Sequence, residues 1–501
     1  MPNLQSNDDL YYLIHQLTPK EKEYFQKSMA RTRQKESAWL QLFVLLSKQS
    51  KYNEQAAKVK FKNYKVLKVQ LKDMIGTAMV NYHRKLHPHV EVMDLLQKSH
   101  FFVSKGMYEE AGKYARKATE QAKRIENFAL TDYALRNEFE IYVKTFSDIH
   151  SLTQLIDQHN TAHNQNIAGQ QELNELEALH MQWFLKGKTG KFDKAELPPL
   201  IHFLQHKTTK GKLAEIKRLG LLDWLLYLNG DYSKSYELTK QQLLLAEDFK
   251  TNHDGSYYSI NAYDNHLLNC IDVKEFDEMV EVGERMKEAE KLNVFHAKLA
   301  FAWSTLHVGL GLCIAGRYAR AYKLLKSNEA ELLKIFGYKH DALGNRALRV
   351  YYNLNLLVLL TNNKLTEAWE AYNLYFAELK KQKPNISVLC IIGLMIQYEL
   401  GNYSLLKSMV AKTQKMFSNH KLTDRASVVM LGFFKNVHEK NRIESAKHCL
   451  LQFEELNKDA NYKNEGVYKL LRYEDWLTAI VKNRSLSKVV QERHSAELQL
   501  L

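Results

Sequence analysis

The sequence is poor in the residues that interrupt helices and in those that cross-link small domains. Its 501 residues include only 6 prolines, 20 glycines and 4 cysteines. All-β and disordered chains need turn residues often, so this composition argues against both classes. The cysteines lie far apart and show no C-x-x-C spacing, which favours buried thiols in a reducing compartment over a disulfide or zinc framework. They are Cys270, Cys313, Cys390 and Cys449.

Targeting signals and long apolar runs are also missing. The first residues, Met1–Asp9, lack the basic and apolar regions of a signal peptide. The longest apolar run, Val388–Ile396, is far shorter than the roughly 20 residues that a membrane helix requires. We therefore expect a soluble, cytoplasmic protein with no membrane partner.

Charge is unevenly distributed along the chain. The formal net charge is +14, and residues 1–90 hold 16 Lys and Arg against 7 Asp and Glu, which is +9. The remaining 411 residues therefore carry only +5. Such an asymmetry points to an anionic partner for the first segment.

The first segment, residues 1–90, is predicted to be a basic helical domain. Thr18-Pro19-Lys20-Glu21 is a helix start, with Thr as N-cap and Glu completing a capping box. Pro88 is expected to end the domain, because proline disfavours helix in the residue before it. The predicted helices cover about residues 19–33, 36–49, 54–59 and 61–86.

One short pattern then recurs along the rest of the chain. Each copy has Gly or Asn, an aromatic or aliphatic residue two positions on, and a small or apolar residue three further on. The copies, some of them degenerate, begin at Gly106, Ser147, Gly190, Gly230, Lys274, Gly316, Asn363, Gly401 and Asn441. Their separations are 41, 43, 40, 44, 42, 47, 38 and 40 residues, which indicates a two-helix repeat.

The clearest copy shows what the pattern does. Gly230 can adopt the positive φ that ends a helix, and Asp231 is expected to cap the next one. Tyr232 can fill the crevice between the two helices, and Ser235 is small enough to let them approach. The preceding stretch, Leu221–Leu228, is apolar nearly all round, as in a buried helix.

This pattern over residues 91–480 resembles the tetratricopeptide repeat superfamily. The resemblance implies an all-α, TPR-like right-handed superhelix of about nine helix pairs, covering residues 91–481. The period exceeds the 34 residues of that family, and three of the nine turns are degenerate, so a divergent array with long helices is expected. Residues 482–501 show no copy of the pattern and are either a capping helix or a tail. The stretch Leu13–Phe25 is also similar to uncharacterised helical-repeat proteins of Bacteroidota.

Sequence motifs for catalysis, nucleotide binding or metal binding are weak. Gly187-Lys188-Thr189 looks like the end of a phosphate-binding loop, but the glycine that the motif requires at position 182 is Gln182. The run Trp183-Phe184-Leu185 before it fits a buried helix and not the strand that such a loop follows. Three His-x-x-x-His pairs lack the glutamate or third ligand of a metal site, which favours solvated or capping histidines. They are His83/His87, His159/His163 and His202/His206. No nucleophile elbow or dinucleotide fingerprint is present, so we expect no enzyme, no cofactor and no metal.

Two sets of residues are candidate binding sites. A lysine stripe lies opposite an apolar helix face and could neutralise phosphates, contact an acidic protein or simply be solvated. No helix-turn-helix signature with its turn glycine precedes it, which argues against nucleic acid. It consists of Lys58, Lys62, Lys65, Lys68 and Lys72. The repeat resemblance also implies that the first helix of each pair lines a concave groove. Asn137, His180, Asn261, Asp264 and Asn353 fall on that line and could bind a ligand or form structural hydrogen bonds.

The sequence therefore favours a non-enzymatic scaffold or adaptor that binds a peptide or protein segment in the groove. The alternative is a regulator whose basic N-terminal domain binds nucleic acid while the repeats sense a partner. The oligomeric state is not determined by the sequence.

Overall fold

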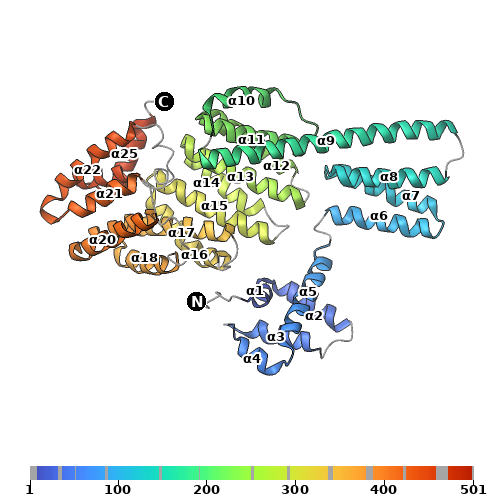
Figure 1. Cartoon of the computed structure of the whole chain (residues 1–501), viewed down its shortest axis with the longest axis horizontal. Helices are drawn as coiled ribbons and strands as arrows, with labels where there is room; N and C mark the ends of the chain where they lie inside the picture. Colours follow the sequence, from blue (N-terminus) through green and yellow to red (C-terminus); the bar gives the residue numbers. More distant parts are fainter. Residues whose placement is uncertain are drawn as a thin grey trace. The chain divides into compact units, whose positions relative to one another are not determined.

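The fold is built from helices (Figure 1). A computed structural model of the chain describes residues 8–31, 37–50, 52–84, 88–145, 149–190, 192–249, 253–289, 294–336, 342–379, 387–420, 425–458 and 472–498. Within these ranges the chain forms helices and turns and no strand. The all-α prediction is confirmed.

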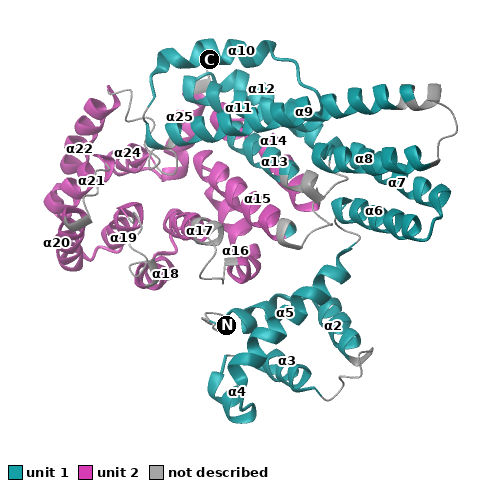
Figure 2. Ribbon diagram, turned by 45° about the vertical axis from the view of Figure 1, so that its right-hand side comes forward, with its two compact units in different colours: residues 1–269, 290–297 teal, residues 270–289, 298–501 magenta. Residues whose placement is uncertain are grey.

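The helices divide into two compact units (Figure 2). Unit 1 comprises residues 1–269 and 290–297, and unit 2 comprises residues 270–289 and 298–501. Two helices, α13 (His253–Val273) and α15 (Val294–Ile314), contribute residues to both units.

Unit 1 begins with five helices around one apolar cluster. They are α1 (Asp9–Gln16), α2 (Pro19–Arg31), α3 (Ala38–Lys48), α4 (Glu54–Lys60) and α5 (Tyr64–Tyr82). The cluster includes Ile14, Phe25, Phe43, Leu71 and Ile75, each fully buried. The predicted capping box is confirmed: Thr18 N–H donates to Glu21 Oε2 at 2.6 Å, and Glu21 N–H donates to Thr18 Oγ1 at 3.2 Å.

The long basic helix predicted from Phe61 begins three residues later. Phe61 and Asn63 have non-helical backbone angles and separate α4 from α5. Phe61 is buried in the apolar cluster, and this burial holds the turn in place. The five predicted lysines therefore do not share one helix, because Lys58 lies on α4 and Lys62 in the turn.

The remaining helices of unit 1 pack against their neighbours in chain order. They are α6 (Pro88–Ser104), α7 (Tyr108–Arg124), α8 (Phe128–Thr145), α9 (Ile149–Thr189), η2 (Lys194–Glu196), α10 (Leu197–His206), α11 (Lys212–Asn229), α12 (Tyr232–Asp248) and most of α13. These neighbour contacts are consistent with a helical repeat. The right-handed superhelix stays a prediction.

One repeat departs from the predicted two-helix pattern. Between the turns predicted at Ser147, which lies outside the described residues, and at Gly190, the chain forms a single helix, α9, of 41 residues. The prediction of a break inside this segment is wrong. Gly169, near its middle, lies so close to the Phe128 ring that an added Cβ would come within 2.6 Å of it. The glycine there serves close packing rather than a turn.

A carboxylate ties the turn between α7 and α8 to the start of α11. Glu126 has a positive φ of 52°. Its side chain accepts hydrogen bonds from the backbone N–H groups of Lys212 and Leu213 at 3.0 and 2.9 Å. These are amides of the first turn of α11, where the helix dipole favours an anion.

Unit 2 contains the end of α13, most of α15 and the helices that follow. These are α14 (Phe276–Ala289), α16 (Tyr318–Phe336), α17 (Ala342–Thr361), α18 (Leu365–Leu379), α19 (Ser387–Glu399), α20 (Tyr403–His420), α21 (Arg425–Asn436), η5 (Glu439–Asn441), α22 (Arg442–Asn457), α24 (Tyr473–Lys482) and α25 (Leu486–Leu498). The last helix returns to the turn at Gly316, where Ser487 Oγ donates to the Gly316 carbonyl at 2.6 Å. The final residues therefore include a docked helix.

Six of the nine predicted turns share one backbone motif. The turn predicted at Asn441 does not have it, because Asn441 has a φ of −114° and precedes α22, and Ser147 lies outside the described residues. At Gly230, φ is +87°, Gly230 N–H donates to the Tyr227 carbonyl at 3.1 Å, and Asp231 N–H donates to the Leu226 carbonyl at 2.9 Å. This is the Schellman arrangement, which satisfies carbonyls at the end of a helix. The same pair of bonds and a positive φ recur at Gly106, Lys274, Gly316, Asn363, Gly401 and Asn483.

Two details of the predicted turns are wrong. Asp231 does not cap α12 with its side chain; its carboxylate pairs with Lys234 at 2.7 Å. The last residues were predicted to lack the turn, yet Asn483 adopts it between α24 and α25. Ser235 behaves as predicted: it is fully buried, and its hydroxyl contacts the Asp223 carboxylate.

The cysteines and the apolar helices belong to the interior. All four cysteines are free and buried, and burial raises the pKa of Cys390 and of Cys449 to about 12. By length and composition alone, Ala297–Ile314 of α15 could cross a membrane, but 61% of that window is buried inside the protein. This is weak evidence for a membrane span, because a core helix passes the same test.

Substitution by alanine is expected to have opposite effects on stability at two glycines of unit 2. Both have open space around them, but only one of them lies in the turn motif. Gly401 has a φ of +70°, whereas Gly432 lies inside α21, and an added Cβ would meet nothing within 4 Å at either position. Gly401→Ala is expected to lower the free energy of unfolding by about 1–2 kcal/mol, because a Cβ disfavours the left-handed conformation. Gly432→Ala is expected to raise it by about 0.5–1 kcal/mol. Denaturant unfolding followed by circular dichroism measures both, and equal losses would contradict the motif.

Candidate functional site

The five predicted groove residues lie in different surroundings. Asn137 on α8 is buried, and its amide donates to Ser99 Oγ on α6 at 3.2 Å, so it has a structural hydrogen bond. His180 on α9 is half-buried, as are Asn261 and Asp264 on α13. Asn353 is also half-buried, on α17 of unit 2. Of these five residues, His180 belongs to a surface that also exposes several large apolar side chains.

That surface is formed by one side of α9 and one side of α11 in unit 1. We call it the α9–α11 face, and its residues are His180, Met181, Phe184, Leu185, Lys217, Trp224 and Tyr227. On α9, Met181 is 61% exposed, Phe184 38% and Leu185 56%. Large apolar side chains that stay exposed together are a feature of interaction sites.

Aromatic rings connect the two helices across this face. The Phe184 ring lies 5.8 Å from the Trp224 ring, which stacks on Tyr227 at 5.6 Å. The Trp224 indole N–H donates to the Trp183 carbonyl at 3.1 Å. An added Cβ at Gly187 would lie 2.6 Å from the indole, so glycine lets Trp224 sit against α9. The aromatic groups are thus held in fixed positions.

A half-buried cation adjoins the rings. Lys217 on α11 pairs with Glu177 on α9, and its ammonium lies 4.8 Å from the Tyr258 ring on α13. Burial alone would lower the pKa of Lys217, but the hydrogen bond to Glu177 and the Tyr258 ring raise it on balance. The neighbouring His180 has its pKa lowered, first by burial and then by the charge of Lys217. The face therefore places an ion-paired ammonium beside an imidazole whose protonation is disfavoured.

The opposite side of α11 borders a cleft of about 480 Å³. Its apolar floor is formed by Leu222, Leu226 and Leu238. The polar residues around it are Gln205, Arg218, Ser233, Lys234, Glu237 and Gln241, from α10, α11 and α12. Arg218 already donates to the Leu204 carbonyl at 2.5 Å and to Glu215 at 2.8 and 2.5 Å, so its guanidinium is largely occupied. The cleft is a second, weaker candidate.

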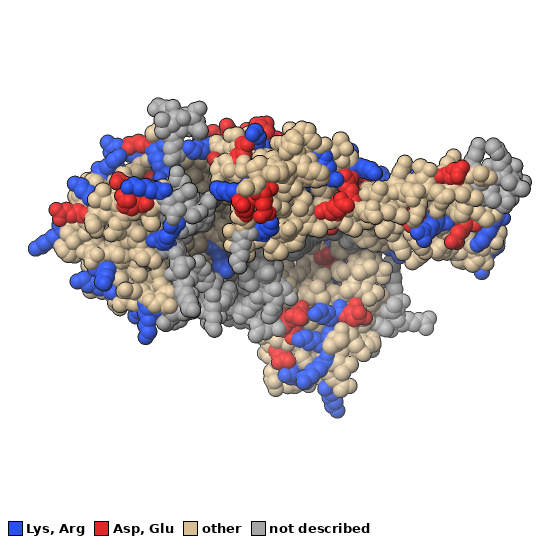
Figure 3. All heavy atoms as spheres, turned by 45° about the horizontal axis from the view of Figure 1, so that its top comes forward, with Lys and Arg blue, Asp and Glu red and all other residues tan. Residues whose placement is uncertain are grey.

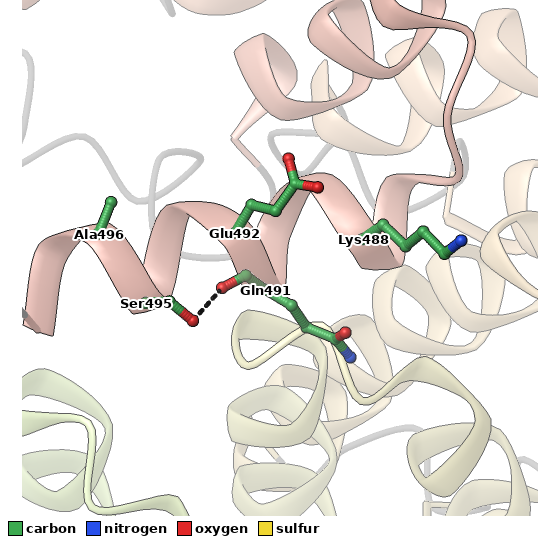
Figure 4. Close-up of a pocket in the computed structure, with 5 residues that line it drawn as sticks. All are labelled: Lys488, Gln491, Glu492, Ser495 and Ala496. Carbon is green, nitrogen blue, oxygen red and sulfur yellow. Dashed lines mark hydrogen bonds between the residues drawn. The ribbon is translucent and has the colours of Figure 1, made fainter.

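Unit 2 has a hollow of about 450 Å³ beside α25. Its lining residues Lys488, Gln491, Glu492, Ser495 and Ala496 all come from that helix (Figure 4). Ser495 Oγ donates to the Gln491 carbonyl at 3.0 Å. The lining has no large apolar side chain, so the hollow resembles a polar helix surface more than a binding pocket.

The predicted lysine stripe is partly neutralised. Lys58 pairs with Glu54 at 3.1 Å and Lys72 with Asp9 at 3.4 Å, while Lys68 pairs with the buried carboxylate of Asp8. Lys62 and Lys65 are exposed. Elsewhere, on the face shown in Figure 3, basic and acidic side chains lie side by side. Among the five lysines of the stripe, all of them within the described residues, the positive charge that no carboxylate pairs therefore remains at Lys62 and Lys65, at the turn between α4 and α5.

The weak chemical motifs have structural roles. Gly187-Lys188-Thr189 is the last turn of α9 and not a phosphate-binding loop. His163 pairs with Asp132, and His159 packs on the Phe139 ring at 4.8 Å. His206 Nδ1 lies 2.9 Å from the His202 carbonyl. His87 lies outside the described residues.

Sequence reasoning missed most of the α9–α11 face. The run Trp183-Phe184-Leu185 was predicted to be buried, but only Trp183 is. The sequence did contain a sign of this exposure. Consecutive residues of a helix point to different sides, so a continuous apolar run cannot be buried against one neighbour along its whole length. Comparison with known proteins finds no family model, no curated protein and no solved structure that matches this chain.

The charge on Lys217 should control the titration of His180. Lys217→Met is expected to raise the pKa of His180 towards its ordinary value of 6.5, as followed by NMR. Lys212→Met is the matched control, because Lys212 lies on the same helix but pairs with Asp248. Since the folded pKa of His180 is lowered, the unfolded chain binds more protons, and stability falls as pH drops below about 6.5. Equal shifts in both variants would contradict this assignment.

Proposed function

We propose that the protein is a non-enzymatic scaffold or adaptor that holds a peptide or protein segment against the α9–α11 face. The observation that carries the proposal is the exposed apolar strip Met181, Phe184 and Leu185 beside the fixed Trp224 ring. Aromatic and apolar anchors at the centre of a surface contribute most of the binding energy in protein complexes.

Preorganisation supports this function. The rings of the face are fixed by the indole hydrogen bond to Trp183 and by the close approach at Gly187. A surface that is already ordered loses less side-chain entropy when a flexible segment binds. In this proposal the helix pairs form the right-handed superhelix implied by the repeat resemblance, and the protein acts in the cytoplasm.

The other predicted groove residues remain part of the proposal. Asn261 and Asp264 are half-buried polar groups on α13 within unit 1, and we propose them as further contacts of the bound segment. Asn353 is a half-buried polar group of unit 2, and we propose it as a separate contact within that unit. Asn137 is the least suitable of the set, because its amide is already bonded to Ser99.

Affinity purification with two double variants tests the proposal. Met181→Glu with Leu185→Glu is expected to reduce recovery of the partner at least tenfold, because it places two charges in an apolar contact. Leu244→Glu with Leu451→Glu is the control: these leucines are 66% and 58% exposed, close to the 61% and 56% of the test pair. It should leave recovery unchanged. Full recovery by the Met181/Leu185 variant would remove the α9–α11 face from consideration.

A further inference from the structure

The N-terminal domain contains a compact helix–turn–helix element. Helix α4 has 7 residues and α5 has 19, and only Phe61, Lys62 and Asn63 separate them. Two helices joined by a three- or four-residue turn are the arrangement that places a second helix in the DNA major groove. The buried residues Ala57, Phe61 and Tyr64 fix the element to the core of the domain.

The missing turn glycine does not argue against this element. A glycine is needed in such a turn only when the backbone requires a positive φ. Here Phe61 has a φ of −124° and Asn63 a φ of −105°. Lys62 is not among the residues with positive φ. Ordinary residues therefore form this turn without strain.

The exposed surface of the element is strongly basic. Residues 54–72 contain 6 lysines and a single acid, Glu54. Lys58, Lys68 and Lys72 have carboxylate partners, which leaves Lys60, Lys62 and Lys65 as the cations around the turn. All three are exposed. In such a motif the first helix crosses the phosphate backbone and the start of the second helix reaches the base edges. Lys60 ends the first helix, Lys62 lies in the turn and Lys65 lies in the first turn of the second helix.

Exposed valines accompany these lysines. Val59 is 77% exposed, Val66 57% and Val69 71%. At 100° per residue, Val66 and Val69 lie about 60° apart on the N-terminal half of α5, in the sector next to Lys65. Small apolar side chains at such positions can contact thymine methyl groups in the major groove.

We propose that α4, the turn and the first three turns of α5 bind duplex DNA, with α5 in the major groove. Duplex is favoured over single strands because the aromatic residues of the element, Phe61 and Tyr64, are buried in the core. Proteins that hold single strands offer aromatic side chains for base stacking. The inference is independent of the α9–α11 face.

Fluorescence anisotropy with the full-length protein and a labelled random-sequence duplex tests this inference. We expect affinity that falls steeply with salt, since each phosphate contact contributes about 0.9 to the slope of log K against log salt. Lys62→Glu with Lys65→Glu should weaken binding at least tenfold and reduce that slope by about 2. An acid at position 65 lies in the first turn of α5, where the helix dipole favours it, so folding should be retained.

Controls separate this site from non-specific charge. Lys412→Glu with Lys415→Glu makes the same change at the same spacing on exposed positions of α20 in unit 2, and it should leave affinity unchanged. Lys62→Gln with Lys65→Gln removes the charges without reversing them and should give an intermediate loss. Equal losses in the Lys62/Lys65 and Lys412/Lys415 variants would overturn the proposal. So would tighter binding to single strands, or to a poly-glutamate peptide, than to duplex.

Discussion

The repeat depends on one backbone device: a residue in the left-handed conformation that lets two amides bond back to the helix just ended. The hydrogen bonds of the device join backbone groups, so residues other than glycine can form it, at the cost of placing a Cβ in the left-handed conformation. It appears with glycine at Gly230, with lysine at Lys274 and with asparagine at Asn363 and Asn483. A Cβ in this conformation costs about 1–2 kcal/mol, which the two hydrogen bonds and the packing of the following helix offset.

The turns also position the surfaces between them. The turn at Gly230 sets the direction of α12 against α11, which places Ser235 beside Asp223 and leaves the other side of α11 for α9. On that side Gly187 lets Trp224 approach α9, and the ring then supports Phe184. The proposed binding face is thus a consequence of close helix packing, with small residues at the contacts and large ones at the edge.

In the first five helices, ion pairs decide both which charged side chains stabilise the fold and which remain on the surface. Asp8 caps α1 through the backbone N–H groups of Leu10 and Tyr11, at 3.0 Å each, and also pairs with Lys68. Burial would raise the pKa of Asp8, but the bonds from Lys68, Tyr52 and Tyr11 lower it on balance. Lys68 is therefore part of the fold. Within the lysine stripe, whose five members all lie in the described residues, the two lysines without such a partner, Lys62 and Lys65, lie at the turn between α4 and α5.

The sequence by itself determined the helical class, the positions of most turns and the capping box at Thr18, because these depend on local conformational preferences. It could not reveal that α9 runs unbroken from Ile149 to Thr189, since nothing local marks the absence of a turn. It also misplaced Phe184 and Leu185, whose exposure depends on which helices pack against α9. Only the tertiary structure decided which lysines are paired and which rings share a face, because those contacts join residues about 40 to 60 positions apart.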